Sequence, residues 1–373
     1  MEYITLKEIA EITMGQSPDS KTYNEDKEGI PFYQGKSDFG KLNPVPRVWC
    51  SKPVKIAKKN DILISVRAPI GDTNITREQC CIGRGLASIR PINSTNINDK
   101  YLYYLINSKY NELNKFGTGS TFKAITKDSL CNLKCKKVPD INIQIEIAKK
   151  LDMVNRLIEI RKKQIESLNT LIKSQFVEMF GNPISNDRKM NYMEMPTVCE
   201  IIDGDRGKNY PKVEEFFEKE YCLFLNAKNV TNNGFSFGNC MYITKEKDNK
   251  LRNGKLKRGD VVLTTRGTVG NLAFYTEEIP FENVRINSGM VILRMKKDIV
   301  NEIFFIEQFK MQLDNIKNKI ANGSAQPQLP ITKMNGIKVL IPPIELQNQF
   351  AEIVKQINKQ KFEDMITILK EII

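Results

Sequence analysis

Few residues of this chain could carry chemistry, and the missing types exclude several enzyme classes. The 373-residue sequence contains no histidine, which rules out Ser–His and Cys–His nucleophile arrangements. It also has no GxxxxGK[ST] phosphate loop, so ATP binding of that kind is not expected. One acidic set remains, Pro18-Asp19 followed by Glu25-Asp26-Lys27, which is typical of nucleases that hold a divalent metal. These residues lie in one polar, turn-rich stretch, so a metal-dependent nuclease using Asp19 and Glu25 is the less favoured alternative.

The eight cysteines do not have the spacing of a metal site. No two of them form a CxxC pair, and the only close non-adjacent pair is Cys131 and Cys135. Without histidine, and with a close pair in only one half of the chain, a zinc site is not expected. We expect free thiols or core residues at Cys50, Cys80, Cys81, Cys131, Cys135, Cys199, Cys222 and Cys240.

The charge balance favours a polyanionic partner. Lysine and arginine number 57 against 44 acidic residues, a formal net charge of +13, and nucleic acid is the first candidate. A lysine-rich proteome would produce the same excess, and composition alone leaves this alternative open. No apolar run reaches the ~18 residues that span a bilayer. The first residues lack a signal-peptide pattern, so we expect a cytoplasmic protein with no membrane partner.

Folded elements must position any binding residues, and the most distinctive element is a long helix predicted over residues 145–181. Its apolar residues recur every seven positions, with companions three residues later, as in a helix that packs along a partner helix. The predicted seam comprises Leu151, Val154, Ile158, Ile165, Leu168, Ile172 and Met179. At ~1.5 Å per residue, these 37 residues would extend about 55 Å. The alternative is one long core helix of a large α/β domain.

A second apolar stripe, in residues 346–373, predicts the partner helix. Lys361 interrupts this stripe at one seam position. Its seam residues are Phe350, Val354, Ile357, Met365 and Ile368. The motif P-x-I-x-x-Q precedes both helices, where Pro139, Ile141 and Gln144 match Pro342, Ile344 and Gln347 at an offset of 203.

An ordered series of such matches predicts that the chain is an internal duplication. The strand pattern DILISVR at 61–67 matches DVVLTTR at 260–266, which places Arg67 on Arg266 at an offset of 199. Gly85 and Arg90 match Gly289 and Arg294 at an offset of 204. Small loop insertions in a duplicated chain produce offsets that change in this gradual way. The halves differ most in their loops, which suits two binders of related but distinct targets.

Two globular repeats, each followed by a long helix, resemble the specificity subunit of type I DNA restriction–modification systems. The motifs that carry the resemblance are GQSPDS…YN…GIPFYQGKSDFG, DGDRGKNYP, GDVVLTTRGTVGN and P-x-I-x-x-Q. Each motif alone is moderately specific, whereas their order and duplication cover nearly the whole chain.

The resemblance implies an α+β fold with an internal pseudo-twofold repeat. It implies two mixed α/β target recognition domains, at 1–142 and 182–342, and two long helices, at 143–181 and 343–373, that form an antiparallel coiled coil. Each domain would read one half of a bipartite target in double-stranded DNA. The helices would set the spacer and dock two methyltransferase (modification) subunits, and restriction or translocase subunits are further partners in the family. A stand-alone or orphan DNA-binding adaptor of the same architecture is the main alternative.

The family's specificity subunit has no catalysis of its own, so we expect no catalytic residues, no metal and no cofactor in this chain. S-adenosylmethionine and ATP would bind to partner subunits only. A DNA methyltransferase would carry an Asn-Pro-Pro-aromatic motif, and Gly181-Asn182-Pro183-Ile184 is the nearest approach. One departure concerns the second helix: the offset of 203 carries Gly181 to position 384, so we expect this helix to be about eleven residues shorter.

Residue type and duplication select the candidate DNA contacts. Gln, Asn, Arg, Lys, Ser and Thr can read base edges, whereas Lys and Arg on phosphate fix position only. The candidates are Gln34, Lys36 and Ser37 with Asn226, Lys228 and Asn229; Arg67 with Arg266; and Ser120, Thr121 and Lys123 with Ser324, Gln326 and Gln328. Candidates for backbone charge are Lys55, Lys58 and Lys59 with Lys255, Lys257 and Arg258. The alternative for each is an ordinary solvated loop residue, and Arg67 and Arg266 would equally serve by bonding carbonyls at the strand end.

Overall fold

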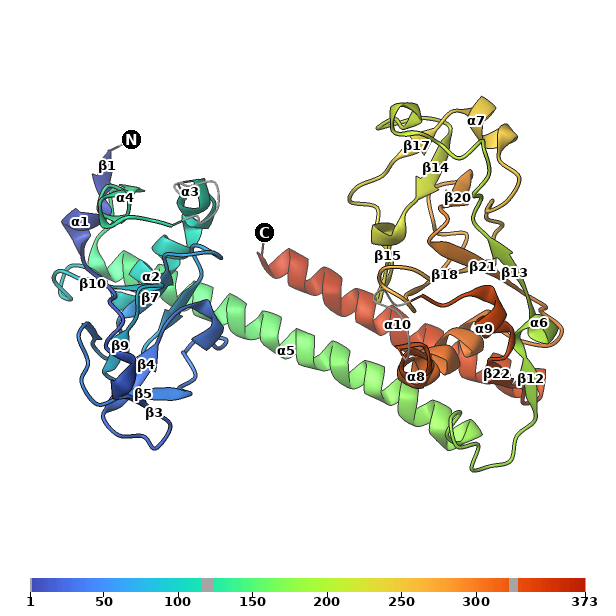
Figure 1. Ribbon diagram of the computed structural model, residues 1–373, viewed down its shortest axis with the longest axis horizontal. Coiled ribbons are helices and arrows are strands. Elements are labelled where there is room, and N and C mark those ends of the chain that lie inside the picture. Colours follow the sequence, from blue (N-terminus) through green and yellow to red (C-terminus); the bar gives the residue numbers. More distant parts are fainter. Residues whose placement is uncertain (1, 116–123, 322–327, 373) are drawn as a thin grey trace. The chain divides into compact units, whose positions relative to one another are not determined.

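The chain divides into two units, and each is described by itself. The computed structural model describes residues 2–115, 124–321 and 328–372 (Figure 1). Unit 1 comprises Met1–Glu159 and unit 2 comprises Ile160–Ile373. Both units contain small sheets and short helices, which is a mixed α and β composition.

Unit 1 is built on a four-stranded antiparallel sheet and a five-stranded mixed sheet. The first has the order β2 (Ala10–Met14), β10 (Leu86–Pro91), β7 (Ile62–Ser65), β8 (Thr73–Ile75). The second has the order β3 (Tyr23–Asn24), β5 (Val48–Cys50), β4 (Ile30–Tyr33), β9 (Cys80–Ile82), β6 (Ile56–Ala57). A two-stranded sheet joins β1 (Tyr3–Thr5) to β11 (Lys134–Lys136). Strand β7 is buried along its whole length, which is consistent with the apolar run of Ile62, Leu63 and Ile64.

Unit 2 repeats the four-stranded arrangement. The order is β13 (Cys199–Asp203), β21 (Met290–Met295), β18 (Val261–Thr264), β19 (Leu272–Phe274). The other sheets are β17 (Tyr242–Ile243), β14 (Cys222–Leu225) and β20 (Val284–Ile286); β15 (Val230–Thr231) and β16 (Gly234–Phe235); and β12 (Tyr192–Glu194) and β22 (Lys338–Leu340). Leu86 pairs with Ser65 in unit 1 and Met290 pairs with Thr264 in unit 2. The two pairs are related by the same offsets as the duplicated sequence segments, 204 for Leu86 and Met290 and 199 for Ser65 and Thr264. The two central sheets therefore pair in the same register.

Short helices cover the sheets, and two long helices dominate the chain. The helices of unit 1 are α1 (Leu6–Ile9), α2 (Asp99–Ser108), α3 (Tyr110–Lys115) and α4 (Lys127–Cys131). Those of unit 2 are α6 (Met195–Val198), α7 (Lys245–Lys250), α8 (Glu302–Ala321), α9 (Ile331–Asn335) and α10 (Ile344–Ile372). Single 3-10 turns are η1 (Ser20–Thr22), η2 (Lys36–Asp38), η3 (Val213–Glu215) and η4 (Ala227–Asn229). Helix α5 runs over Ile141–Phe180 and contributes residues to both units.

The same buried ion pair ties the two central strands together in each unit. In unit 1, Arg90 Nη2 donates to Asp61 Oδ2 at 2.7 Å. In unit 2, Arg294 donates to both carboxylate oxygens of Asp260, at 2.9 and 2.8 Å. Both aspartates are almost fully buried, and they also accept backbone N–H groups of the preceding turn. The matched Arg90 and Arg294 are therefore frame residues that satisfy a buried carboxylate.

Helices α5 and α10 lie side by side within unit 2, in antiparallel directions (Figure 1). The rings of Phe176 and Phe350 meet edge to face with centroids 5.4 Å apart. Toward the other end of the contact, Arg161 Nη1 donates to Asp364 Oδ1 at 3.3 Å. Lys361, the residue that interrupts the apolar stripe, donates to Asn169 Oδ1 at 2.7 Å. The contact therefore has an aromatic end and a polar end.

The predicted seam residues have different degrees of burial. Fully buried are Ile172, Phe350 and Val354, and half-buried are Val154, Ile158, Ile165, Leu168 and Ile357. Leu151 belongs to unit 1 and is exposed. The side chains of Met365 and Ile368 lie outside the described residues. After Ile172 the buried positions are Phe176 and Phe180, whereas the heptad residue Met179 is only half-buried. A spacing of four follows the 3.6-residue turn of a straight helix rather than a heptad repeat.

The cysteines agree with the expectation of free thiols or core residues. All eight cysteines are free, and six of them are buried. Within the described ranges, none of the helices combines the length and the apolar character that crossing a bilayer requires.

Truncating Phe176 should destabilise unit 2. Its ring is fully buried against Phe180, Phe304 and Phe350, so we expect Phe176→Ala to lower the free energy of unfolding by about 3–5 kcal/mol. The measurement is urea denaturation followed by circular dichroism. Trp49, the only tryptophan, reports unit 1 separately by fluorescence.

The matched control is Phe362→Ala, because Phe362 lies on α10 and its side chain is 63% exposed. We expect a change within about 0.5 kcal/mol for this variant. Equal effects of the two substitutions would contradict the burial of Phe176 in a packed helix contact.

Candidate nucleic-acid interface

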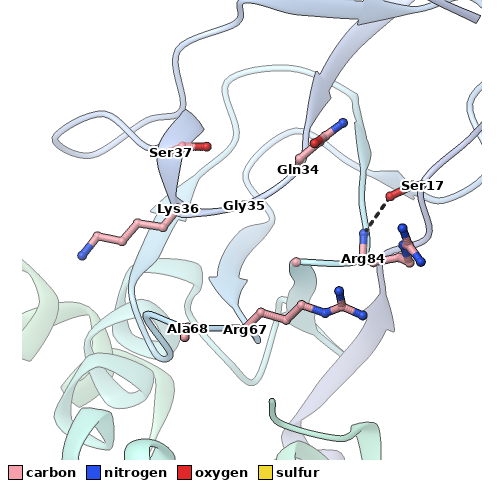
Figure 2. A pocket seen from close by; sticks show the side chains of 9 residues that line it. Ser17, Gln34, Gly35, Lys36, Ser37, Arg67, Ala68 and Arg84 are labelled. Carbon is pink, nitrogen blue, oxygen red and sulfur yellow. Dashed lines mark hydrogen bonds between the residues drawn. The ribbon is translucent and has the colours of Figure 1, made fainter. Parts of the chain in front are cut away.

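The first candidate site lies at the carboxyl end of strand β7. Arg67 follows this strand and forms an isolated β-bridge with Ala124. Arg67 lines a pocket together with residues from three other turns. The residues that line this pocket are Ser17, Gln34, Gly35, Lys36, Ser37, Arg67, Ala68, Arg84 and Gly85. Figure 2 shows Arg67, Arg84, Ser17 and Gln34 on one side of this pocket, while Lys36 extends to the other side. The structure therefore brings together four of the predicted contacts: Gln34, Lys36, Ser37 and Arg67.

A buried hydroxyl holds the turn that carries this arginine. Ser65 Oγ donates to the carbonyl of Pro69 at 2.7 Å and accepts the N–H of Asp72 at 3.0 Å. In unit 2, Thr264 Oγ1 donates to the carbonyl of Thr268 and accepts the N–H of Asn271 at 2.9 Å. Both hydroxyls are fully shielded from solvent. These hydrogen bonds fix the backbone beside Arg67 and Arg266, so each arginine starts from a rigid strand end.

The glycines of these turns are needed for their backbone conformation. Gly71 has φ +90° and Gly270 has φ +97°, in the region that L side chains rarely adopt. Their N–H groups donate to the carbonyls of Ser65 and Thr264, each at 2.9 Å. The duplicated glycine in the sequence therefore marks a turn requirement. Both glycines are buried, whereas Arg67 and Arg266 are exposed.

Lys36 is less available than its residue type suggests. Its ammonium pairs with the carboxylate of Asp72 at 2.9 Å, and this hydrogen bond raises the pKa of Lys36. Gln34 and Ser37 are exposed. The backbone N–H of Gln34 donates to Asp38 Oδ2 at 2.7 Å, which fixes the loop that carries Gln34.

The second candidate site lies at the equivalent strand end in unit 2. Arg266 follows β18 and forms an isolated bridge with Gln328, as Arg67 does with Ala124. The pocket is lined by Asp203, Arg206, Thr265, Arg266, Val291, Gln328, Leu329, Pro330, Ile331 and Thr332. Two predicted contacts, Arg266 and Gln328, therefore meet here. Asn226, Lys228 and Asn229 do not line this pocket.

The structure corrects the assignment of Asn229 as a DNA contact. Asn229 is 2% exposed, its amide oxygen accepts the N–H of Asn226, and its amide nitrogen donates to the carbonyls of Ser236 and Asn239. All of these groups belong to the loop itself, so Asn229 holds the loop together and has no free edge. Asn226 caps η4 by accepting the N–H of Lys228, and only Lys228 is fully exposed.

Some of the basic residues before strand β18 also have structural roles. Lys255 pairs with the buried Asp248 at 2.6 Å. Arg258 donates to the carbonyls of Thr276 and Ile279 and lies 4.2 Å from the centre of the Tyr275 ring. These two residues are therefore held within the unit. Five other predicted contacts, Ser120, Thr121, Lys123, Ser324 and Gln326, lie outside the described residues.

Two arginines that line these pockets were missed by sequence reasoning. Arg84 lines the first pocket and Arg206 lines the second, and both are exposed. They do not occupy matching sequence positions, so the duplication does not identify them. Proximity to Arg67 and Arg266 in space is the signal that identifies them.

Neither pocket has the character of a small-molecule site. Their volumes are about 310 and 200 Å³, at or below the low end of ligand pockets, and their linings are mainly polar. Asp19 caps η1 by accepting the N–H of Lys21 at 3.0 Å, and Glu25 is exposed. Among the residues with described positions, no cluster of three or more Cys, Asp or Glu side chains could hold a metal ion. The geometry instead presents arginine side chains at an open surface.

Comparison with known proteins identifies the family. The model of the type I restriction modification DNA specificity domain matches residues 1–170 and 188–372. The type I restriction enzyme MjaX specificity subunit of Methanocaldococcus jannaschii is 43% identical over 157 residues, which cover 42% of this chain and 36% of that relative. The MjaIX specificity subunit of the same organism is 26% identical over an alignment that covers 98% of this chain and 89% of that relative.

A solved structure shares the fold. The crystal structure of the type I restriction-modification system S subunit from M. genitalium has a TM-score of 0.58 and 16% sequence identity, and the match covers 99% of this chain and 92% of that one. At this identity the likeness concerns the fold alone. Together with the family match in both halves, it confirms the resemblance drawn from the motifs.

Removing the amide of Asn229 should destabilise unit 2. Asn229→Ala leaves the N–H of Asn226 and the carbonyls of Ser236 and Asn239 without their partner, so we expect a loss of about 2–3 kcal/mol in urea denaturation. The control is Asn232→Ala in the same loop, where the side chain is exposed and a change within about 0.5 kcal/mol is expected. An Asn229→Ala variant of unchanged stability but altered DNA specificity would restore Asn229 as a DNA contact.

Proposed function

The chain belongs to the type I restriction–modification DNA specificity family, and we propose that each of its two units reads one half of a bipartite DNA target. The observation that carries this proposal is the exposed arginine at the same strand end in both units. Arg67 and Arg266 follow matching buried strands, are fixed by matching hydroxyl hydrogen bonds, and lie beside polar loops that differ between the units. A rigid basic anchor surrounded by variable polar loops suits the combination of phosphate positioning and base readout.

The net charge supports the same partner. An excess of 13 positive charges attracts a polyanion, and duplex DNA presents one negative charge about every 1.7 Å along its axis. In this proposal the target recognition domains occupy residues 1–142 and 182–342. Gln34, Ser37, Lys228 and Gln328, whose side chains are exposed, are the candidates for base edges.

The long helices would serve as spacer and docking surface. We propose that residues 143–181 and 343–373 form an antiparallel coiled coil whose length sets the unread gap between the half-sites. The contacts of Phe176 with Phe350 and of Arg161 with Asp364 support an antiparallel pair. Helix α5 also exposes large apolar side chains, and those most exposed are Ile143, Met153, Ile160 and Leu171. Exposed apolar side chains of this size suit a protein partner, and two methyltransferase (modification) subunits are the partners we propose.

Catalysis would then belong to the partners. We propose that this chain is non-catalytic, that S-adenosylmethionine and ATP bind to partner subunits, and that the methyltransferase flips the target base out of the duplex. Restriction or translocase subunits would join the same assembly.

Methylation mapping tests this proposal directly. Co-expression of the chain with its neighbouring methyltransferase subunit should produce one modified motif, consisting of two short half-sites separated by a fixed gap. Sequencing of modified bases across the genome measures it. Copurification without methylation, or a continuous motif without a gap, would contradict bipartite reading, and failure to copurify would contradict docking by the helices.

Exchange of one recognition domain tests the division of labour. If residues 1–142 are replaced by the corresponding domain of a relative with another target, one half-site should change while the other half-site and the gap stay the same. The same mapping measures the result, and the reciprocal exchange of residues 182–342 is the control. A change in both half-sites after either exchange would show that the two units do not read separately.

A further inference from the structure

Two turns lie against each other at the edge of each pocket, and their contacts define equivalent positions in the two units. Gly15 donates its N–H to the carbonyl of Leu86 at 2.9 Å, and Gly204 donates to that of Met290 at 3.4 Å. A β-carbon on Gly15 would lie 2.1 Å from the carbonyl oxygen of Gly83. One on Gly204 would lie 2.1 Å from that of Asn287. Gly15 and Gly83 are therefore the spatial counterparts of Gly204 and Asn287.

This equivalence shows that an arginine and a serine have exchanged places. Two residues after the first glycine, unit 1 has Ser17 and unit 2 has Arg206. One residue after the second position, unit 1 has Arg84 and unit 2 has Ser288. The exchanged residues still contact each other.

In unit 1 the N–H of Arg84 donates to Ser17 Oγ at 3.4 Å, and in unit 2 Arg206 Nη2 donates to the carbonyl of Ser288 at 3.3 Å. Each unit therefore keeps one arginine at the contact between the two turns, although a different turn supplies it.

Each exchanged arginine lies beside the duplicated one. Arg84 and Arg67 line one pocket, and Arg206 and Arg266 line the other. All four residues are exposed. Within the part of the chain that the structure describes, Arg67, Arg84 and Arg266 have no acidic partner. Two exposed guanidinium groups at one open pocket repel each other unless an anion lies between them.

We propose that Arg84 and Arg206 are equivalent contacts to the DNA backbone, each forming a two-arginine clamp on a phosphate with Arg67 or Arg266. This inference rests on the proposed function and adds two residues to it. A guanidinium binds phosphate oxygens through paired N–H donors, which suits both members of such a clamp.

The exchange itself favours phosphate over a base edge as the ligand. To read a guanine, an arginine must aim two N–H donors at the base edge, in the plane of the base. An arginine supplied by another turn would approach that edge from a different direction. A phosphate presents acceptor oxygens in several directions, so it tolerates either origin. Both units keep a positive charge at the same place, although different turns supply it. A positive charge at a fixed place is what a contact to a DNA phosphate requires.

The two clamps differ in how freely the exchanged arginine can bind. Arg206 Nη2 pairs with the carboxylate of Asp203 at 3.0 Å, whereas Arg84 has no such partner in the described structure. Asp203 occupies the position that corresponds to the uncharged Met14 in unit 1. Arg84 should therefore contribute more to the salt dependence of binding than Arg206.

The test is the salt dependence of duplex binding by the complex with its methyltransferase subunit. The probes are a fluorescent duplex with the mapped methylation motif and a scrambled duplex. We expect Arg84→Gln to reduce the slope of log affinity against log salt by about 0.9, the value for one lost phosphate contact. The variant would then lose about 3.5-fold less affinity than the unaltered complex over a fourfold rise in salt. Both duplexes should weaken equally, and the methylation motif should stay the same.

Moving the arginine provides the decisive variant. Ser17→Arg combined with Arg84→Ser gives unit 1 the arrangement of unit 2, and we expect it to restore most of the lost slope. Arg77→Gln is the control, because Arg77 is exposed in unit 1 but does not line the pocket, and the slope should not change. Thermal unfolding at the same temperature as the unaltered chain would show that each variant is folded.

Three results would overturn the inference: an unchanged slope for Arg84→Gln, no rescue by the exchanged pair, or a change in the methylated motif, which would make Arg84 a base reader. If the unaltered complex bound neither duplex in a salt-dependent way, the proposed function itself would fail and the inference with it.

Discussion

The structure depends on how each long helix is fixed to its own unit, and one buried glutamine does this in each half. Gln144 accepts the N–H of Asn98 at 3.0 Å and donates to the carbonyl of Pro139 at 2.7 Å. Gln347 accepts the N–H of Asn301 at 2.9 Å and donates to the carbonyl of Pro342 at 2.8 Å. Neither side chain is exposed, so every hydrogen-bonding group must be satisfied inside the protein. These hydrogen bonds therefore tie the first turn of each long helix to the chain segments beside it.

The same separation of frame and surface continues through the β-rich parts. Buried polar groups make matching contacts in the two units. They are the aspartates that precede β7 and β18, each paired with an arginine, and the hydroxyls of Ser65 and Thr264. The loops beyond the strand ends are exposed and differ between the units. A buried polar residue cannot be replaced without leaving its hydrogen-bond partner unpaired, which is costly. Exposed loop residues have no such constraint and can differ between the units. Under the proposed function, this difference would allow one architecture to carry two recognition surfaces.

The frame could be predicted from sequence because its signals are local. Strand patterns, glycine positions and the glutamine motif repeat at consistent offsets, and helix periodicity depends on near neighbours. The site was harder, because its residues meet through strand pairing between distant segments. Ser17 and Arg84 are 67 residues apart and meet only through the contact of two turns. Asn229 looked like a surface residue from its type, and only the fold shows that its amide is used by the loop.

Unequal charge in the two units has a consequence for how DNA would be approached. Charge attracts at a distance, whereas hydrogen bonds to bases act only on contact, so unpaired arginines dominate the first encounter. Unit 1 presents Arg67 and Arg84 without acidic partners in the described structure, while in unit 2 Asp203 offsets part of the charge of Arg206. Exchanging the ion pair of Arg206 for a phosphate must break an existing interaction, which lowers the net gain. Unit 1, whose two arginines have no acidic partner in the described structure, would therefore hold DNA more strongly before either half-site is read. In unit 2, phosphate contacts would contribute less to binding, and discrimination between sequences would depend more on contacts to the bases.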